Sequence, residues 1–168
     1  MASSLYAQGA IPFIAGIQLE TGSGSLPQGK MGTGLVRATP FIGAWLQGIG
    51  YAKLGMSYWN AKETDSLDVD QGITERDLSL QLATSLGGQG RPYLIASYVR
   101  AKQLSEAGDA SWNEWGTGLG AFFELNGLSA LMLEGEYRWI GKHYDPVRSV
   151  DYEGTRIQLN LGFVVYFY

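Results

Sequence analysis

Near the C-terminal end of the chain, apolar and polar side chains alternate from Thr155 to Phe167. Period two places successive side chains on opposite faces of an extended chain, so this segment predicts a long β-strand. Its apolar face continues for about ten residues, the length that a tilted strand needs to cross a bilayer.

The same alternation recurs along the rest of the chain. In one segment, Leu78, Leu80 and Leu82 share a face, whereas Asp77 and Gln81 share the other. We therefore predict about eight antiparallel strands, which include segments near 8–20, 32–46, 50–61, 72–86, 92–104, 115–125 and 131–139. Asn126-Gly127 predicts a type I′ hairpin turn between the last two of these segments, because both residue types tolerate positive φ angles.

The connections between these segments alternate between short and long. Short ones are expected near 47–49, 87–91 and 127. Longer ones, which contain many Asp, Ser and Gly residues, are expected near 21–31, 61–72, 105–113 and 142–151. This rhythm is typical of an up-and-down barrel with short periplasmic turns and longer external loops, and both termini then lie on the periplasmic side.

Pro40 interrupts the second segment. Proline cannot donate a ladder hydrogen bond, and a closed barrel has no edge strand on which to place it. We therefore expect a β-bulge at Pro40 that changes the outward-facing residues from Val36 and Ala38 to Phe41 and Trp45.

Composition excludes several classes of protein. The 168 residues show no shift in composition, so we predict one domain over 1–168. The chain has no cysteine, which excludes disulfides and thiolate chemistry, and its net charge of -4 argues against a nucleic-acid partner. Polar residues interrupt every apolar run, so no helical membrane span is expected. The first residues lack the features of a secretory signal, so an exported form would be the mature one.

Alternation alone does not distinguish a transmembrane barrel from a soluble, lipocalin-like, ligand-binding barrel, which places its apolar side chains inside. Two features favour lipid outside. The apolar face of most strands carries almost no charge, as hydrocarbon requires. Aromatic residues gather near the strand ends, which predicts two interfacial girdles; these residues are Trp45, Tyr58, Tyr93, Trp115, Phe123, Tyr137, Trp139 and Phe167.

Charged residues on the polar face provide a third indication. When residues are counted from the short turns, opposite charges fall at similar heights, and Lys53 falls level with Glu124. Buried ions persist only when they are paired, so we predict an ion-pair network in a narrow lumen. Its members are Arg37, Lys53, Asp77, Arg100, Glu124, Glu134, Glu136, Arg138 and Arg156.

The final residues resemble the assembly signal of outer-membrane barrels, in which a polar residue is followed by a glycine two positions later and then by two spaced hydrophobic residues. Asn160, Gly162, Val165 and Phe167 occupy these positions, with Tyr168 added at the end. Together with the eight predicted strands and their alternating short and long connections, this motif makes the chain resemble the small barrels of the OmpA and OmpX type. The resemblance implies an integral outer-membrane protein that the barrel-assembly machinery inserts.

Candidate chemistry is sparse. The single histidine, His143, lies near Asp145, Ser149 and Asp151, as a lipid hydrolase or acyltransferase would require, but Ser149 lacks a nucleophile-elbow context. Asp65, Asp68 and Asp70 match a calcium-binding loop only in part. We therefore predict no metal, no cofactor and no catalytic site.

The functional expectation is a monomeric outer-membrane protein with a structural or interaction role, embedded in outer-membrane lipid. Its external loops are expected to present a binding surface, with another envelope protein as a possible partner. A small pore and a lipid-modifying enzyme are the alternatives that remain. Eight strands leave an interior that side chains can fill, so conduction should be negligible.

Overall fold

The computed structural model describes residues 13–25, 35–46, 50–64, 70–87 and 92–167. Within them the chain forms eight β-strands, and no described helix is long and apolar enough to cross a membrane. The strands are β1 (Phe13–Ser25), β2 (Leu35–Leu46), β3 (Gly50–Thr64), β4 (Asp70–Ser85), β5 (Pro92–Ser105), β6 (Gly108–Asn126), β7 (Ser129–Asp145) and β8 (Val150–Phe167).

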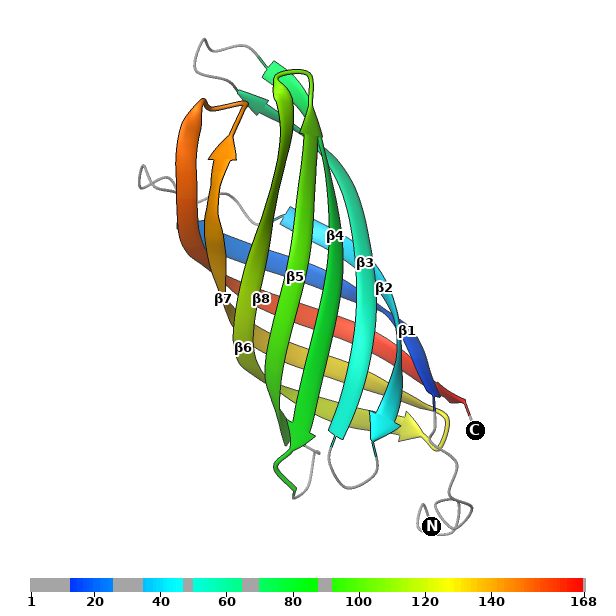
Figure 1. The fold of residues 1–168 in the computed structure, drawn as a ribbon. Helices are drawn as coiled ribbons and strands as arrows, with labels where there is room; N and C mark the ends of the chain where they lie inside the picture. The colour runs from blue at the N-terminus through cyan, green and yellow to red at the C-terminus, as the bar shows by residue number, and fades with distance from the viewer. Residues whose placement is uncertain (1–12, 26–34, 47–49, 65–69, 88–91, 168) are drawn as a thin grey trace.

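Each strand pairs antiparallel with its neighbour in sequence, and β1 pairs with β8 to close the barrel (Figure 1). The closing ladder runs from Phe13 opposite Phe167 to Ser25 opposite Thr155. The start of β1 and the end of β8 lie at the same end of the barrel as the ends of β2 and β4, the starts of β3 and β5, and the β6–β7 turn (Figure 1). The predicted all-β, up-and-down barrel of eight strands is therefore confirmed.

Several strands extend further than the sequence predicted. The expected long loop over 105–113 is wrong, because β5 and β6 continue to a tight hairpin in which the Ser105 hydroxyl donates to the Gly108 carbonyl over 2.7 Å. Between β7 and β8, only residues 146–149 lie outside the strands. The alternation was weaker there because these ladders rise beyond the apolar band, where outward side chains need not be apolar.

The turn between β6 and β7 also differs from the expected type I′ turn. Asn126 is the last residue of β6, and its side-chain oxygen accepts hydrogen bonds from the Leu128 amide at 2.8 Å and the Ser129 hydroxyl at 3.1 Å. Among the described residues, neither Asn126 nor Gly127 has the positive φ that type I′ demands. The asparagine side chain thus stabilises the turn in place of the positive φ angles.

The predicted bulge at Pro40 is wrong. Pro40 pairs with Ile17 of β1 in an unbroken register, and Phe41 points inward while Ile42 is 66% exposed. The described β2–β3 ladder starts at Phe41 opposite Gly55. Pro40 is therefore not paired with a residue of β3, and its lack of an amide hydrogen costs no hydrogen bond to that strand. The same side of β2 continues to face outward, and no bulge is needed.

The two faces of the barrel wall differ in polarity. Leucines such as Leu80, Leu119 and Leu159 are exposed on the exterior, whereas Glu134 and Arg138 are buried inside. A soluble barrel has the reverse arrangement, because its apolar side chains avoid water by pointing inward. The exterior is therefore suited to hydrocarbon, and the soluble-barrel alternative does not fit this structure.

Candidate functional site

A layer of aromatic rings fills the lumen near the end of the barrel at which β1 begins and β8 ends. Tyr51, Tyr93 and Phe122 are each at most 2% exposed, and their ring centroids lie 4.9 to 5.5 Å apart. Trp45 packs edge-on against Phe122, with centroids 5.2 Å apart. These rings come from β2, β3, β5 and β6, so the layer extends across the barrel rather than along one wall.

Glu134 of β7 lies above this layer and accepts hydrogen bonds from several strands. The hydroxyls of Tyr51 and Tyr93 donate to its Oε1 over 2.5 and 3.0 Å. The Gln81 amide donates to the same oxygen over 2.9 Å. A buried carboxylate is tolerated only when such donors replace water, and Glu134 has them from β3, β4 and β5.

The positive partner of Glu134 is Lys53 of β3. Its Nζ lies 3.1 Å from Glu134 Oε2 and donates to Gln18 Oε1 over 2.6 Å. In an eight-stranded barrel, β3 and β7 are four strands apart in both directions, so they are opposite walls. The Lys53–Glu134 pair therefore crosses the lumen at its full width.

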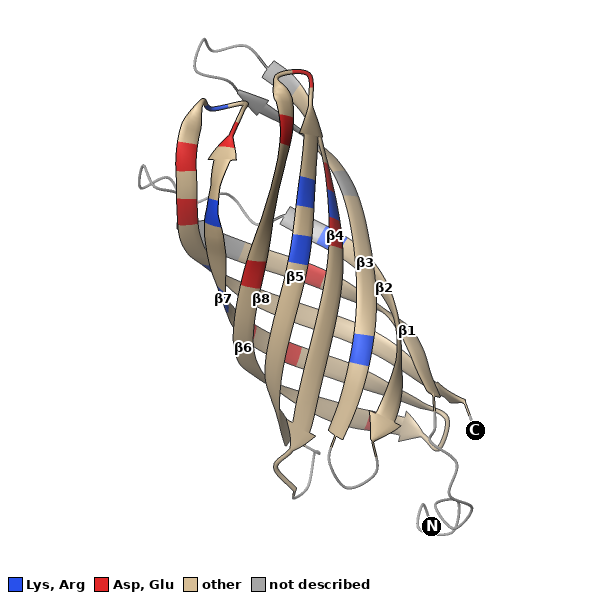
Figure 2. Ribbon diagram, in the orientation of Figure 1, with Lys and Arg blue, Asp and Glu red and all other residues tan. Residues whose placement is uncertain are grey.

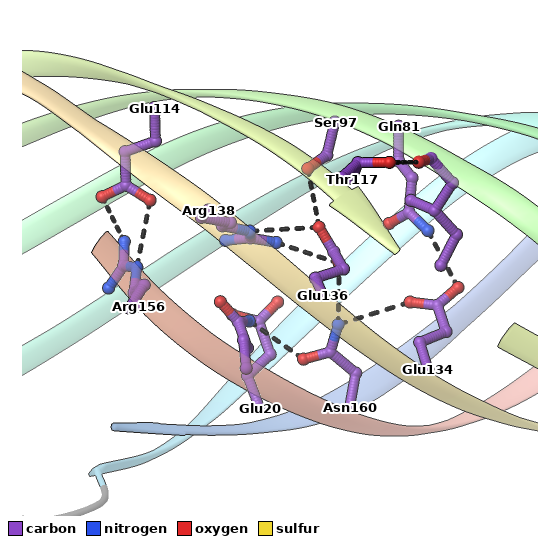
Figure 3. A network of polar contacts seen from close by, with 12 residues as sticks. Glu20, Gln81, Ser97, Glu114, Thr117, Glu134, Glu136, Arg138, Arg156 and Asn160 are labelled. Atoms are coloured by element: carbon purple, nitrogen blue, oxygen red, sulfur yellow. Dashed lines mark hydrogen bonds and ion pairs between the residues drawn. The ribbon is translucent and has the colours of Figure 1, made fainter. Parts of the chain in front are cut away.

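A second group of polar side chains adjoins Glu134 (Figure 3). Glu136 accepts from Ser97 over 2.6 Å, from Arg138 Nε over 3.1 Å and from the Asn160 amide over 3.0 Å. Asn160 also donates to Glu134 over 3.4 Å, which links the two groups. The network thereby joins β5, β7 and β8 through buried hydrogen bonds.

Three further ion pairs, made by two arginines, lie nearer the opposite end of the lumen. Arg37 of β2 contacts Asp77 and lies 2.8 Å from Glu75, both on β4. Arg156 of β8 pairs with Glu114 of β6, which also accepts from Trp112 Nε1 over 2.8 Å. Sequence reasoning missed Glu75 and Glu114. Each points to the same side of its strand as other residues that line the lumen.

Glycines on β6 make room for this network. A side-chain carbon added at Gly116 would lie 2.3 Å from Ser97 Oγ, and one at Gly120 would lie 2.3 Å from the Tyr93 ring. One at Gly118 would lie 2.1 Å from the Gly135 carbonyl oxygen of β7. Gly116 and Gly120 therefore leave space that neighbouring side chains occupy, and Gly118 lies against the backbone of β7.

Two residues of the predicted network lie elsewhere. Arg100 is exposed on the exterior, because its neighbours Val99 and Ala101 on β5 point into the lumen. Glu124 is exposed beside the β6–β7 turn, and Lys53 pairs with Glu134 instead. Arg100 was misplaced because height above a turn does not establish which face of a strand points inward. Glu124 lies on the inward side of β6, opposite the buried Ala130, but so close to the end of the barrel that its side chain is exposed. The structure places the other seven predicted residues in the lumen.

The predicted interfacial aromatics divide in a similar way. Six are exposed on the exterior: Tyr58, Trp115, Phe123, Tyr137, Trp139 and Phe167. Trp45 and Tyr93 instead belong to the interior aromatic layer. Both lie near strand ends, but their parity is inward, so their assignment to an interfacial girdle was wrong.

The residues of the resembled assembly signal occupy different environments on β8. Asn160 is buried in the lumen network, and Phe167 is exposed on the exterior. A side-chain carbon at Gly162 would lie 3.4 Å from Met132 Cβ, in ordinary contact. Val165 is half-buried.

His143 stacks on Trp112, with ring centroids 4.4 Å apart, and its Nδ1 lies 2.9 Å from the Gly141 carbonyl oxygen. Asp145 accepts from the Val147 amide over 2.9 Å, and Asp151 pairs with Lys142 at 3.1 Å. These carboxylates stabilise a turn and a surface pair. In the part of the chain that the structure describes, no group of His, Asp and Glu could hold a metal ion, while Asp65 and Asp68 lie outside that part.

Comparison with known structures identifies the fold. Neisserial surface protein A has a TM-score of 0.65 at 16% identity, over 92% of this chain and 97% of that one. The outer membrane protein OprG from Pseudomonas aeruginosa has a TM-score of 0.57 at 11% identity, over 95% and 97%. Ail, the attachment invasion locus protein of Yersinia pestis, has a TM-score of 0.51 at 11% identity, over 94% and 99%. No protein-family model and no curated protein matches the chain.

The fold is that of the small eight-stranded outer-membrane barrels. With an apolar exterior and a charged interior, the barrel has the polarity of a protein that crosses a membrane with its strands.

Proposed function

We propose that this protein is a non-conducting outer-membrane barrel with a structural or interaction role. The observation that carries the proposal is the Lys53–Glu134 pair, which joins opposite walls of the lumen directly above a layer of packed aromatic rings. Both charged side chains are at most 5% exposed. An ion would have to displace this pair and the rings beneath it in order to pass.

The interaction surface is proposed to lie on the β5–β6 and β7–β8 hairpins, at the end of the barrel opposite the start of β1 and the end of β8 (Figure 1). Trp112 and His143 stack in this region and Tyr152 packs edge-on against His143, which gives the hairpins a firm base. A rigid base of this kind suits a surface that docks against another envelope protein, because little ordering is required on binding.

Recordings from planar bilayers test the proposal. The purified barrel is expected to give no stable single-channel steps. The triple variant Lys53→Ala, Tyr51→Ala and Glu134→Ala, which removes the crossing pair and one ring beneath it, is expected to give steps if it folds. Large steps from the unaltered protein would favour the small pore instead.

A lipid-modifying enzyme is the second candidate, and it is tested separately. Incubation of the purified barrel with phospholipid or lipid A vesicles is expected to leave both lipids unchanged. Turnover that His143→Ala abolishes would overturn the proposed non-enzymatic role.

A further inference from the structure

Three basic side chains point outward on adjacent strands. Arg76 of β4 and Arg100 and Lys102 of β5 are exposed, and together we name them the basic patch. Arg76 is the register partner of Lys102, while Arg100 is paired with the outward-facing Leu78. Residues directly opposite each other have Cβ atoms about 5 Å apart, and diagonal neighbours are about 7–8 Å apart. The three cations therefore lie within reach of a single anionic group.

The positive charge of the patch is only partly compensated. Arg100 donates to two neutral acceptors, Asn113 Oδ1 at 2.7 Å and Ser111 Oγ at 3.0 Å. Lys102 lies 3.2 Å from Asp109, but both side chains are more than half exposed, and such a pair contributes little.

The acidic neighbours of Arg76 do not offset its charge on the exterior. Glu75 and Asp77 point into the lumen, where they contact Arg37. Within the described ranges, no carboxylate forms an ion pair with Arg76 or Arg100. The exterior at this point on β4 and β5 is therefore positively charged. Figure 2 marks Lys and Arg in blue, and Asp and Glu in red, along the two strands.

The basic patch lies at the upper border of the apolar band. The Arg76 guanidinium lies 5.7 Å from the Tyr58 ring centroid, and the Tyr98 and Trp115 rings lie 4.7 Å apart on the neighbouring strands. Such aromatic side chains favour the level of the lipid headgroups. Below them on β4, Leu78 and Leu80 face outward, where acyl chains would lie.

We infer that the basic patch binds the phosphate group of an outer-leaflet lipid whose acyl chains pack along Leu78 and Leu80. A guanidinium matches phosphate with two parallel hydrogen bonds, and the lysine adds a point charge. A lipid is favoured over a soluble anion because the cations stand directly above an apolar surface. Lys142 of β7 is also exposed and lies 3.1 Å from Asp151, but it is on a strand that does not adjoin β4 or β5.

Native mass spectrometry of the full barrel in phosphatidylcholine nanodiscs tests the inference. One set of nanodiscs contains diphosphorylated lipid A, and a matched set contains dephosphorylated lipid A. The unaltered barrel is expected to retain about tenfold more of the phosphorylated form. The triple variant R76Q, R100Q and K102Q should lose that preference. The control K142Q, which removes an exposed positive charge elsewhere, should keep it.

Each other outcome overturns the inference. Equal retention of the two lipids would show that phosphate is not recognised, and an equal loss in K142Q would show an effect of overall charge. Complete displacement by excess inorganic phosphate would assign the patch to a soluble anion instead. If the triple variant does not fold, R100Q alone is compared with K142Q, and at least a twofold loss of the preference is expected in R100Q.

Discussion

Lys53 Nζ lies 3.1 Å from Glu134 Oε2, although the two residues are 81 positions apart in the sequence and on opposite walls of the barrel. Most ladder contacts hold a strand only to its neighbours. This ion pair instead joins β3 to β7 through the lumen, so it stabilises the cross-section of the barrel.

Removal of one partner of this pair should be costly. Lys53→Met is expected to lower the free energy of unfolding by about 3–5 kcal/mol, because Glu134 would remain buried without its positive partner. Urea unfolding in lipid vesicles, followed by tryptophan fluorescence, measures the change. The double variant Lys53→Met with Glu134→Gln should recover part of the loss. A single variant as stable as the parent would show that the pair contributes nothing.

Gly120 should not tolerate a side chain. A carbon added there would lie 2.3 Å from the Tyr93 ring, so Gly120→Ala is expected to cost about 1–3 kcal/mol through overpacking. Gly72→Ala is the matched control, because nothing lies within 4 Å of its added carbon. Urea unfolding of both variants checks the prediction, and equal stabilities would contradict it. Tyr93→Leu should relieve part of the strain in Gly120→Ala.

The exterior should reject charge in a way that depends on depth. Leu80→Arg, within the apolar band, is expected to cost about 2–4 kcal/mol in a bilayer, whereas Asn60→Arg, beyond Tyr58, should cost less than about 1 kcal/mol. Unfolding in vesicles compares the two variants. If the costs are equal, Leu80 does not face hydrocarbon.

Tryptophan fluorescence should distinguish the lumen from the exterior. In variants that retain one tryptophan each, brominated lipid is expected to quench Trp115 and Trp139, which are 62% and 48% exposed on the outer face. Trp45 should be quenched much less, because it packs against Phe122 inside. Strong quenching of Trp45 would return it to the interfacial girdle that its position in the sequence had suggested.

Closure of the barrel can be tested by cross-linking, since the chain has no cysteine of its own. Leu19 and Leu161 are register partners on β1 and β8, so a cysteine at each should form a disulfide on mild oxidation. A gel-mobility shift that reducing agent reverses measures this. Cysteines at Leu19 and Leu80 should not cross-link, because β1 and β4 are not neighbours. Cross-linking of the second pair but not the first would contradict the strand order.

The sequence alone determined the class of fold. Two patterns were sufficient to predict strands with lipid on one face. They are the alternation from Thr155 to Phe167 and the uncharged face formed by Leu78, Leu80 and Leu82. Period two is a local property of the chain, so it can be read without knowing which strands meet. The same property predicted eight strands and most of the inward-facing charges.

Only the tertiary structure decided which charges meet. Lys53 pairs with Glu134 across the lumen rather than with Glu124, and Arg100 faces outward. β5 gave little local signal, because its inward residues Ile95 and Val99 are as apolar as its outward ones. A contact across the barrel depends on strand register and closure, which are properties of all eight strands together. A single strand therefore carries no information about its partner on the opposite wall.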